Sequence, residues 1–122
     1  MSIQDVIAFL EDLGVTTPIY PFAFPASSPT EAVIVEVGQG ANTRGSVMEI
    51  TLTITVRAGH PSVGEKIGQE LIDKLKDLSD VMVGENTQFI MVKSQQLLPY
   101  PLGKDVNNNH FYMLNFRALA TQ

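Results

Sequence analysis

Apolar and polar side chains alternate along residues 46–57, SVMEITLTITVR, and this alternation predicts a β-strand. Successive side chains of a strand point to opposite faces of a sheet, so the strand has one apolar face and one face rich in hydroxyl groups. The apolar face carries Met48, Ile50, Leu52, Ile54 and Val56, and the other carries Thr51, Thr53 and Thr55. We expect the apolar face to bury the core, which leaves the use of the threonine face open.

Three further segments have the composition of strands. Residues 31–37, EAVIVEV, are apolar on both faces over their middle, and we expect them to form an antiparallel hairpin with residues 46–57. The segment between these two strands, residues 38–45, has the sequence GQGANTRG and predicts a long, glycine-rich hairpin tip. Residues 89–97 and 110–120 are the other predicted strands, with a loop over residues 98–109 between them.

Residues 16–30 contain four prolines and three aromatic side chains. Proline cannot donate a hydrogen bond to a neighbouring strand, so this segment cannot be a central strand, although residues 20–24 could form a short edge strand. Two interpretations follow. The segment is either a connection packed against the core or an extended arm that reaches a neighbouring subunit.

Helical periodicity occurs twice. Residues 3–13 place apolar side chains on one face, with Ser2 as the predicted N-cap and Gly14 as the stop. Residues 63–78 form the second predicted helix, for which Ser62 and Glu65 have the spacing of a capping box. The apolar line of that helix comprises Ile67, Leu71, Leu75 and Leu78.

The order of these elements predicts one α+β domain over residues 1–122. Its expected core is a four-stranded or slightly larger, mainly antiparallel sheet with two helices packed on one face, in the order α-β-β-α-β-β. A chain of 122 residues is long enough to bury a hydrophobic core without a metal or disulfide staple.

Composition and charge exclude several classes of protein. The net charge is −5, with six acids and two bases in residues 1–61 and seven acids and six bases in residues 62–122. This distribution leaves no basic stripe, so we expect no specific nucleic-acid binding and no anionic membrane partner. The chain has no cysteine, which excludes disulfides, thiolate metal sites and a cysteine nucleophile. The opening segment carries acids and no basic residue, and no apolar run is long enough for a membrane span, so we expect a soluble protein made in the cytoplasm.

Candidate chemistry is sparse. Gly38 and Gly40 follow a strand, as in a dinucleotide-binding turn, but strand alternation comes next where that motif needs a helix. His60 and His110 could meet Asp105 in a metal or acid–base cluster, yet their spacing favours ordinary loop or capping histidines. No serine lies in a G-x-S-x-G elbow. We therefore assign no catalytic, cofactor-binding or metal-binding residues and expect no enzyme.

The element order and several local patterns resemble the phage minor capsid or tail completion proteins, which are similar to the tail terminators of long-tailed phages. The closing pattern is the most specific part of the resemblance, and it has one departure. Residues 107–109 are three asparagines where a glycine is expected, but asparagine tolerates left-handed backbone, so the turn is retained. The matching segments are Ile19-Tyr20-Pro21, Ala32-Val33-Ile34-Val35, Ile54-Thr55-Val56-Arg57-Ala58, the stretch from Pro99 to Asp105, and Leu114-Asn115-Phe116.

This resemblance implies a structural role in the virion, after assembly in the cytoplasm of a host bacterium. Proteins of this kind form a ring, commonly of six subunits, at the head-proximal end of the tail tube. The ring stops tube polymerisation and joins the tail to the head. The implied partners are other copies of the chain, the major tail tube protein and the head connector protein. An acidic protein also suits a channel through which DNA passes without sticking.

The threonine face then has two interpretations, a solvated outer face or a contact with other copies or with the tube. We predict the second, together with contacts from the hairpin tip and from the loop over residues 98–109. The predicted contact residues are Gly40, Asn42, Arg44, Thr51, Thr53, Thr55, Tyr100, Lys104 and Asp105. The alternatives are a head completion or connector protein of the same virion and, as a different class, a small-ligand-binding module that uses the sheet as its floor.

Overall fold

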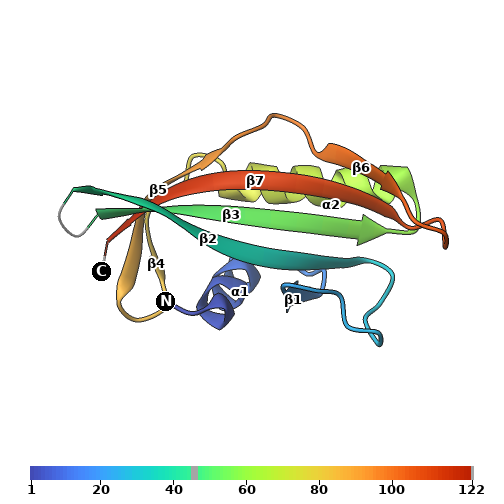
Figure 1. The fold of residues 1–122 in the computed structure, drawn as a ribbon, viewed down its shortest axis with the longest axis horizontal. Coiled ribbons are helices and arrows are strands. Elements are labelled where there is room, and N and C mark those ends of the chain that lie inside the picture. The colour runs from blue at the N-terminus through green and yellow to red at the C-terminus, as the bar shows by residue number, and fades with distance from the viewer. Residues whose placement is uncertain (45–46, 122) are drawn as a thin grey trace.

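The computed structural model describes residues 1–44 and 47–121, without the side chains of residues 39–44. Over these residues the chain forms two helices and seven strands (Figure 1). In chain order they are α1 (Ile3–Asp12), β1 (Ile19–Pro21), β2 (Ala32–Arg44), β3 (Val47–Ala58), α2 (Pro61–Leu75), β4 (Ser79–Val83), β5 (Thr87–Ser94), β6 (Tyr100–Lys104) and β7 (His110–Thr121).

The strands form one mixed, curled sheet, a half-barrel in the order β1-β2-β3-β7-β5-β4, with β6 pairing β7. Strands β2, β3 and β7 are long and antiparallel and make the centre of the sheet (Figure 1). The short edge strand β1 pairs with β2 in parallel. The predicted four-stranded sheet and the order α-β-β-α-β-β are therefore wrong. Strands β4 and β6 were missed because each has only five residues, too few for a periodic pattern to be recognised. Strand β1 lies at the sheet edge and overlaps the short edge strand that residues 20–24 could form.

Strand β7 shares one edge between two partners. Its C-terminal half pairs with β5, and its N-terminal half pairs with β6. Between them, the side-chain amide of Gln96 bonds the backbone of β7: its Nε2 donates to the Met113 carbonyl at 2.8 Å, and its Oε1 accepts from the Asn115 N–H at 3.0 Å. The amide thus satisfies backbone groups that no strand covers, which allows the chain to leave the sheet and return as β6.

Both helices cover the inner face of the sheet. The predicted inner positions of β3 are buried, with Leu52, Ile54 and Val56 at 0% exposure, and Tyr112, Leu114, Phe116 and Ala118 of β7 are buried beside them. Helix α2 lies over β3 and β7, whereas α1 lies beside β1, β2 and β4 (Figure 1). The alternation in the two long strands therefore predicted their core faces correctly.

The ends of the helices follow local rules. Ser2 is the N-cap of α1, as predicted, and the structure shows that it forms a capping box with Asp5. Gly14 follows the helix with φ +95°. The predicted cap of α2 is wrong: its N-cap is His60, whose Nδ1 accepts from the Ser62 N–H at 3.1 Å. Pro61 shifts the helix start to this point, because proline has a helical φ and no N–H to satisfy at the first helical position.

Helix α2 also ends before Leu78, at Leu75. Two glycines let this helix lie close to its neighbours. A Cβ on Gly64 would fall 2.5 Å from the Tyr112 ring, and one on Gly68 would fall 2.8 Å from Pro99. Residues 95–99 thus cross α2 at Gly68, on their way from β5 to β6.

The predicted long tip over residues 38–45 is wrong for residues 38–44, which belong to β2, while Gly45 lies outside the described residues. Strand β2 continues to Arg44, and register shifts fall between Gln39 and Asn42 and between Asn42 and Arg44. Such bulges accommodate an extra residue without ending the pairing, and glycine is frequent where they occur. The predicted antiparallel hairpin between β2 and β3 is confirmed.

Candidate assembly surface

The outer face of the sheet lies opposite the helices, and the threonines of β3 form its middle. Thr51, Thr53 and Thr55 are half-buried. They lie between Gly38, Glu36 and Ile34 of β2 on one side and Arg117, Asn115 and Met113 of β7 on the other. The Thr53 hydroxyl donates to the Asn115 Oδ1 at 3.3 Å. The middle of this face is therefore polar. Of the six residues that flank the threonines on β2 and β7, only Glu36 carries a negative charge.

Arg57 holds the proline-rich segment over one end of the outer face. Its guanidinium donates to the Thr30 carbonyl at 3.1 Å and, through Nη2, to the Pro29 carbonyl and the Ser28 Oγ, both at 2.7 Å. The guanidinium carbon also lies 4.2 Å from the centre of the Phe24 ring. This set of contacts supports the interpretation of a packed connection for residues 24–30.

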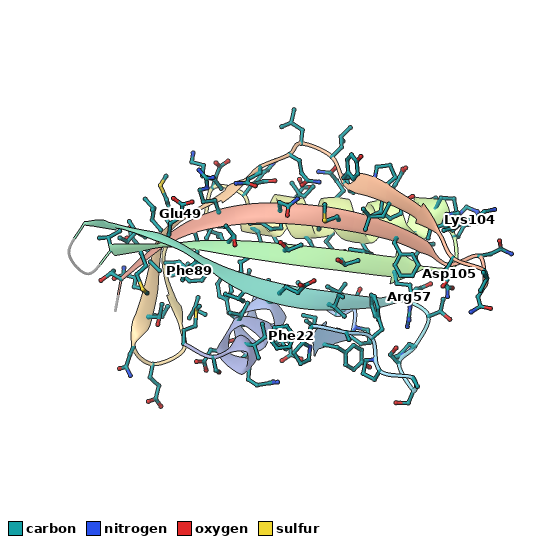
Figure 2. The ribbon with its side chains drawn as sticks, viewed as in Figure 1. Phe22, Glu49, Arg57, Phe89, Lys104 and Asp105 are labelled. Carbon is teal, nitrogen blue, oxygen red and sulfur yellow. The ribbon has the colours of Figure 1, made fainter. Side chains whose placement is uncertain are left out.

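The opposite end of the outer face carries an ion pair. Arg117 Nε and Glu49 Oε1 are 2.9 Å apart, and both side chains are partly exposed. Figure 2 places Glu49 and Arg57 near opposite ends of β3. The threonines thus lie between a charged end and an end covered by the chain itself.

Beside the outer face runs an exposed apolar segment, residues 97–106, which we call the β6 segment. All five residues of β6 are exposed, and the side of β6 away from β7 has no strand partner within the described chain. The exposed large apolar side chains of the segment are Leu97 (88%), Leu98 (70%), Tyr100 (60%), Leu102 (50%) and Val106 (96%). A concentration of exposed apolar side chains on a soluble domain is typical of an interaction surface.

A shallow hollow of about 360 Å³ lies where the β6 segment meets the outer face. Its lining is mainly apolar and includes the polar residues Gln96 and Asn115. The remaining lining residues are Leu98, Pro99, Tyr100, Pro101 and Met113.

The loop after β6 is organised by Asp105. Its Oδ1 accepts the backbone N–H groups of Asn107 and Asn109, both at 2.9 Å. The hydrogen bond from the Asn109 N–H is the largest cause that lowers the pKa of this carboxyl below its ordinary value of 3.8. Asn108 adopts φ +61°, so an asparagine does occupy left-handed backbone in this turn. Lys104 and Asp105 lie together where β6 ends (Figure 2).

The nine predicted contact residues therefore fall into three groups. Thr51, Thr53 and Thr55 lie on the outer face, while Tyr100, Lys104 and Asp105 lie on or next to β6, on the opposite side of β7 from β3. Gly40, Asn42 and Arg44 belong to β2, but their side chains lie outside the described part of the chain. The predicted loop over residues 98–109 is in part a strand, because residues 100–104 pair with β7.

Leu97, Leu98, Leu102 and Val106 were not among the predicted contact residues. The sequence signal was a set of large apolar residues inside a stretch otherwise typical of a loop. Their importance comes from their exposure, which depends on tertiary structure.

The two histidines have structural positions. His60 caps α2, and His110 begins β7, opposite Lys104 and Ala58. Within the described residues, no three His, Asp or Glu side chains gather in a way that could hold a metal ion. In the same part of the chain, no helix has the length and apolar character needed to cross a membrane.

The described residues form a β-rich fold with an exposed apolar segment beside a largely polar sheet face, and sequence comparison assigns the class of this protein. The profile of the family described as "Bacteriophage tail terminator protein" matches residues 9–122. The chain belongs to this family. Its role is thus that of a structural component of the phage tail or head–tail junction, and its place is in the virion.

Comparison of folds gives a consistent result. A chain from the structure titled "Virion of native gene transfer agent (GTA) particle" is similar to this protein, with a TM-score of 0.67 and 15% sequence identity. The similarity covers 98% of this chain and 91% of the other. No curated protein sequence matches the chain.

Proposed function

We propose that copies of this protein form a closed ring, a hexamer, at the head-proximal end of the tail tube. The ring stops tube polymerisation and joins the tail to the head connector. The observation that carries this proposal is the outer face of the sheet: the protein's own helices leave it uncovered, and an exposed apolar segment runs beside it. A tail terminator needs such surfaces because it contacts its own copies, the major tail tube protein and the head connector.

The character of the outer face suits a reversible protein contact. Threonine hydroxyls are neutral, so burying them requires less desolvation than burying charged groups, and they can form hydrogen bonds across an interface. The apolar β6 segment supplies the surface whose burial drives association. In this arrangement the threonines form hydrogen bonds across the interface, and burial of the apolar segment provides most of the free energy of binding.

The net charge of −5 is compatible with a ring through which DNA passes. A strongly basic lining would bind the phosphate backbone and retain the DNA. An acidic ring repels the phosphates, so the genome would pass through without a stable contact.

The proposal is tested by electron microscopy of label-tagged protein mixed with headless tail tubes from the same source. Label at one end of each tube, together with arrested growth, is the expected result. Label along the sides of the tubes, or none, would contradict the proposal. Label found on the connector of tailless heads and absent from tubes would instead assign the protein to the head.

A further inference from the structure

The two edge strands β1 and β6 are both linked to the same row of paired residues across the sheet, and each edge carries exposed apolar side chains. Register pairs Ile19 with Val33, Val33 with Val56, Val56 with Tyr112, and Tyr112 with Pro101. This row crosses five strands, from β1 at one edge to β6 at the other. Figure 1 shows β1 and β6 on opposite sides of β2, β3 and β7. The two edges are thus far apart on one subunit but can meet between neighbouring subunits.

The β1 edge projects an aromatic side chain. Phe22 follows β1 directly and is 60% exposed, although its ring would be favourable to bury. Its backbone has φ +65°, a conformation that bulky residues rarely adopt. Hydrogen bonds from the Phe22 N–H to the Val35 carbonyl at 3.1 Å and from the Ala23 N–H to the Pro21 carbonyl at 2.7 Å hold this turn. These bonds therefore hold the backbone that carries the exposed Phe22 ring.

The β6 edge offers a complementary surface. The shallow hollow beside β6 has a mainly apolar lining, and the exposed side chains of Leu98 and Tyr100 belong to that lining. A projecting aromatic ring and an apolar hollow are the two halves of a common type of interface anchor.

We infer that in the ring the Phe22 turn of one copy packs against the β6 segment of the next copy, with the Phe22 ring at the hollow. This inference rests on the ring proposed above and names its subunit contact. A ring closes through head-to-tail contacts, which require two different patches on opposite sides of each subunit. The Phe22 turn and the β6 segment meet this requirement, because they differ in shape, match in apolar character and occupy opposite edges.

Disulfide cross-linking tests the contact directly, because the chain has no native cysteine. The double variant Phe22→Cys with Leu98→Cys is oxidised in the presence of tail tubes. Head-to-tail packing predicts a ladder of covalent oligomers that ends at the ring size. The matched control is Met82→Cys with Leu98→Cys, since Met82 is similarly exposed, at 55%, but lies on β4. The control is expected to give no ladder.

The outcomes separate the contact from the proposed function. Binding at the tube end without a ladder would overturn the contact and leave the ring proposal standing. Equal ladders from both double variants, together with binding at the tube end, would have the same meaning. A ladder specific to the first variant without binding at the tube end would support the contact and overturn the terminator role. Absence of both would overturn both.

A mixing experiment provides a second test. Phe22→Asn removes the ring while suiting the left-handed backbone, and Leu98→Ser alters an exposed position, so both variants are expected to fold. Each alone is expected to lose at least ten-fold in assembly at the tube end. In an equimolar mixture, the native Phe22 turn of the Leu98→Ser variant can pack against the native β6 segment of the Phe22→Asn variant. No other contact between the two variants has both patches intact, so the mixture is expected to give pairs and no rings. Met82→Ser is the control that assembles normally. Full rings from either single variant would overturn the inference.

Discussion

The two faces of β3 differ in what surrounds them, although they alternate along the same twelve residues. Leu52, Ile54 and Val56 on the inner face are fully buried under the helices. Thr51, Thr53 and Thr55 on the outer face are half-buried, and their strand neighbours are residues of β2 and β7. One strand thus supplies the core with one face and, in the proposed ring, an assembly surface with the other.

The comparison teaches that stability and assembly can be changed separately in this protein. Substitutions at inner positions are expected to act on the free energy of unfolding. Substitutions at outer positions are expected to act on assembly and to leave the isolated chain folded. Four experiments follow, in order from the largest expected effect on stability to the smallest.

Leu52→Ala is expected to lower the free energy of unfolding by about 2–5 kcal/mol, because it opens a cavity in a fully buried site. Its matched control is Thr53→Val, the next residue on the other face, which keeps the branched shape and is expected to change stability by less than about 0.5 kcal/mol. Urea unfolding followed by circular dichroism measures both. Equal losses for the two variants would show that the faces are not distinct.

Arg57→Gln is expected to lower the free energy of unfolding by about 1–3 kcal/mol, because three hydrogen bonds and the contact with the Phe24 ring are lost. Arg117→Gln is the control at the other end of the outer face. Its ion pair with Glu49 is exposed, so the expected loss is below about 1 kcal/mol. If thermal unfolding ranks the two variants in reverse order, the proposed clamp on the proline-rich segment is wrong.

Thr53→Arg is expected to change the free energy of unfolding by less than about 0.5 kcal/mol, because the position is half-buried and next to Glu36. The same variant is expected to block assembly, since it places a long charged side chain in the middle of the outer face. Size-exclusion chromatography checks that the isolated chain stays folded, and sedimentation with tail tubes measures assembly. Normal sedimentation of the variant would mean that this face is only solvated.

The smallest effect concerns the loop after β6. The Asn109 N–H lowers the pKa of Asp105, so the folded state favours the carboxylate. The resulting stabilisation is present above the ordinary value of 3.8 and is lost as pH falls through the lower folded pKa. NMR titration of the Asn107 and Asn109 amides is expected to show a midpoint below 3.8. In Asp105→Ala this titration should vanish; a midpoint at or above 3.8 in the native chain would contradict the hydrogen bonding described.

Sequence patterns predicted the parts of the fold that local physics determines. The alternation of β3 and β7 gave the correct core faces, and Ser2 is the N-cap of α1 as expected. The start of α2 was missed by two residues because Pro61 at the first helical position prevailed over the S-x-x-E spacing. Strand β2 keeps its regular register at Gly38 and continues past Gly40 through register shifts, which depend on pairing with β3 and have no local signature.

The candidate surface was less predictable than the fold. The threonine row could be read from the sequence, because its face follows from the two-residue period of a strand. The exposure of Leu98 and Phe22 could not be read from the sequence. The exposure of Leu98 follows from the Gln96 side chain, which takes the place of a strand residue beside β7, and that of Phe22 follows from the turn after β1. Neither feature has a periodic pattern.

The most direct measurement of the central claim is the length distribution of tail tubes polymerised from the major tail tube protein. The account predicts that the native chain shortens the tubes in proportion to its concentration, whereas Thr53→Arg leaves them as long as tubes grown without it. Tubes of unchanged length with the native chain, or equal shortening by the variant, would contradict the account.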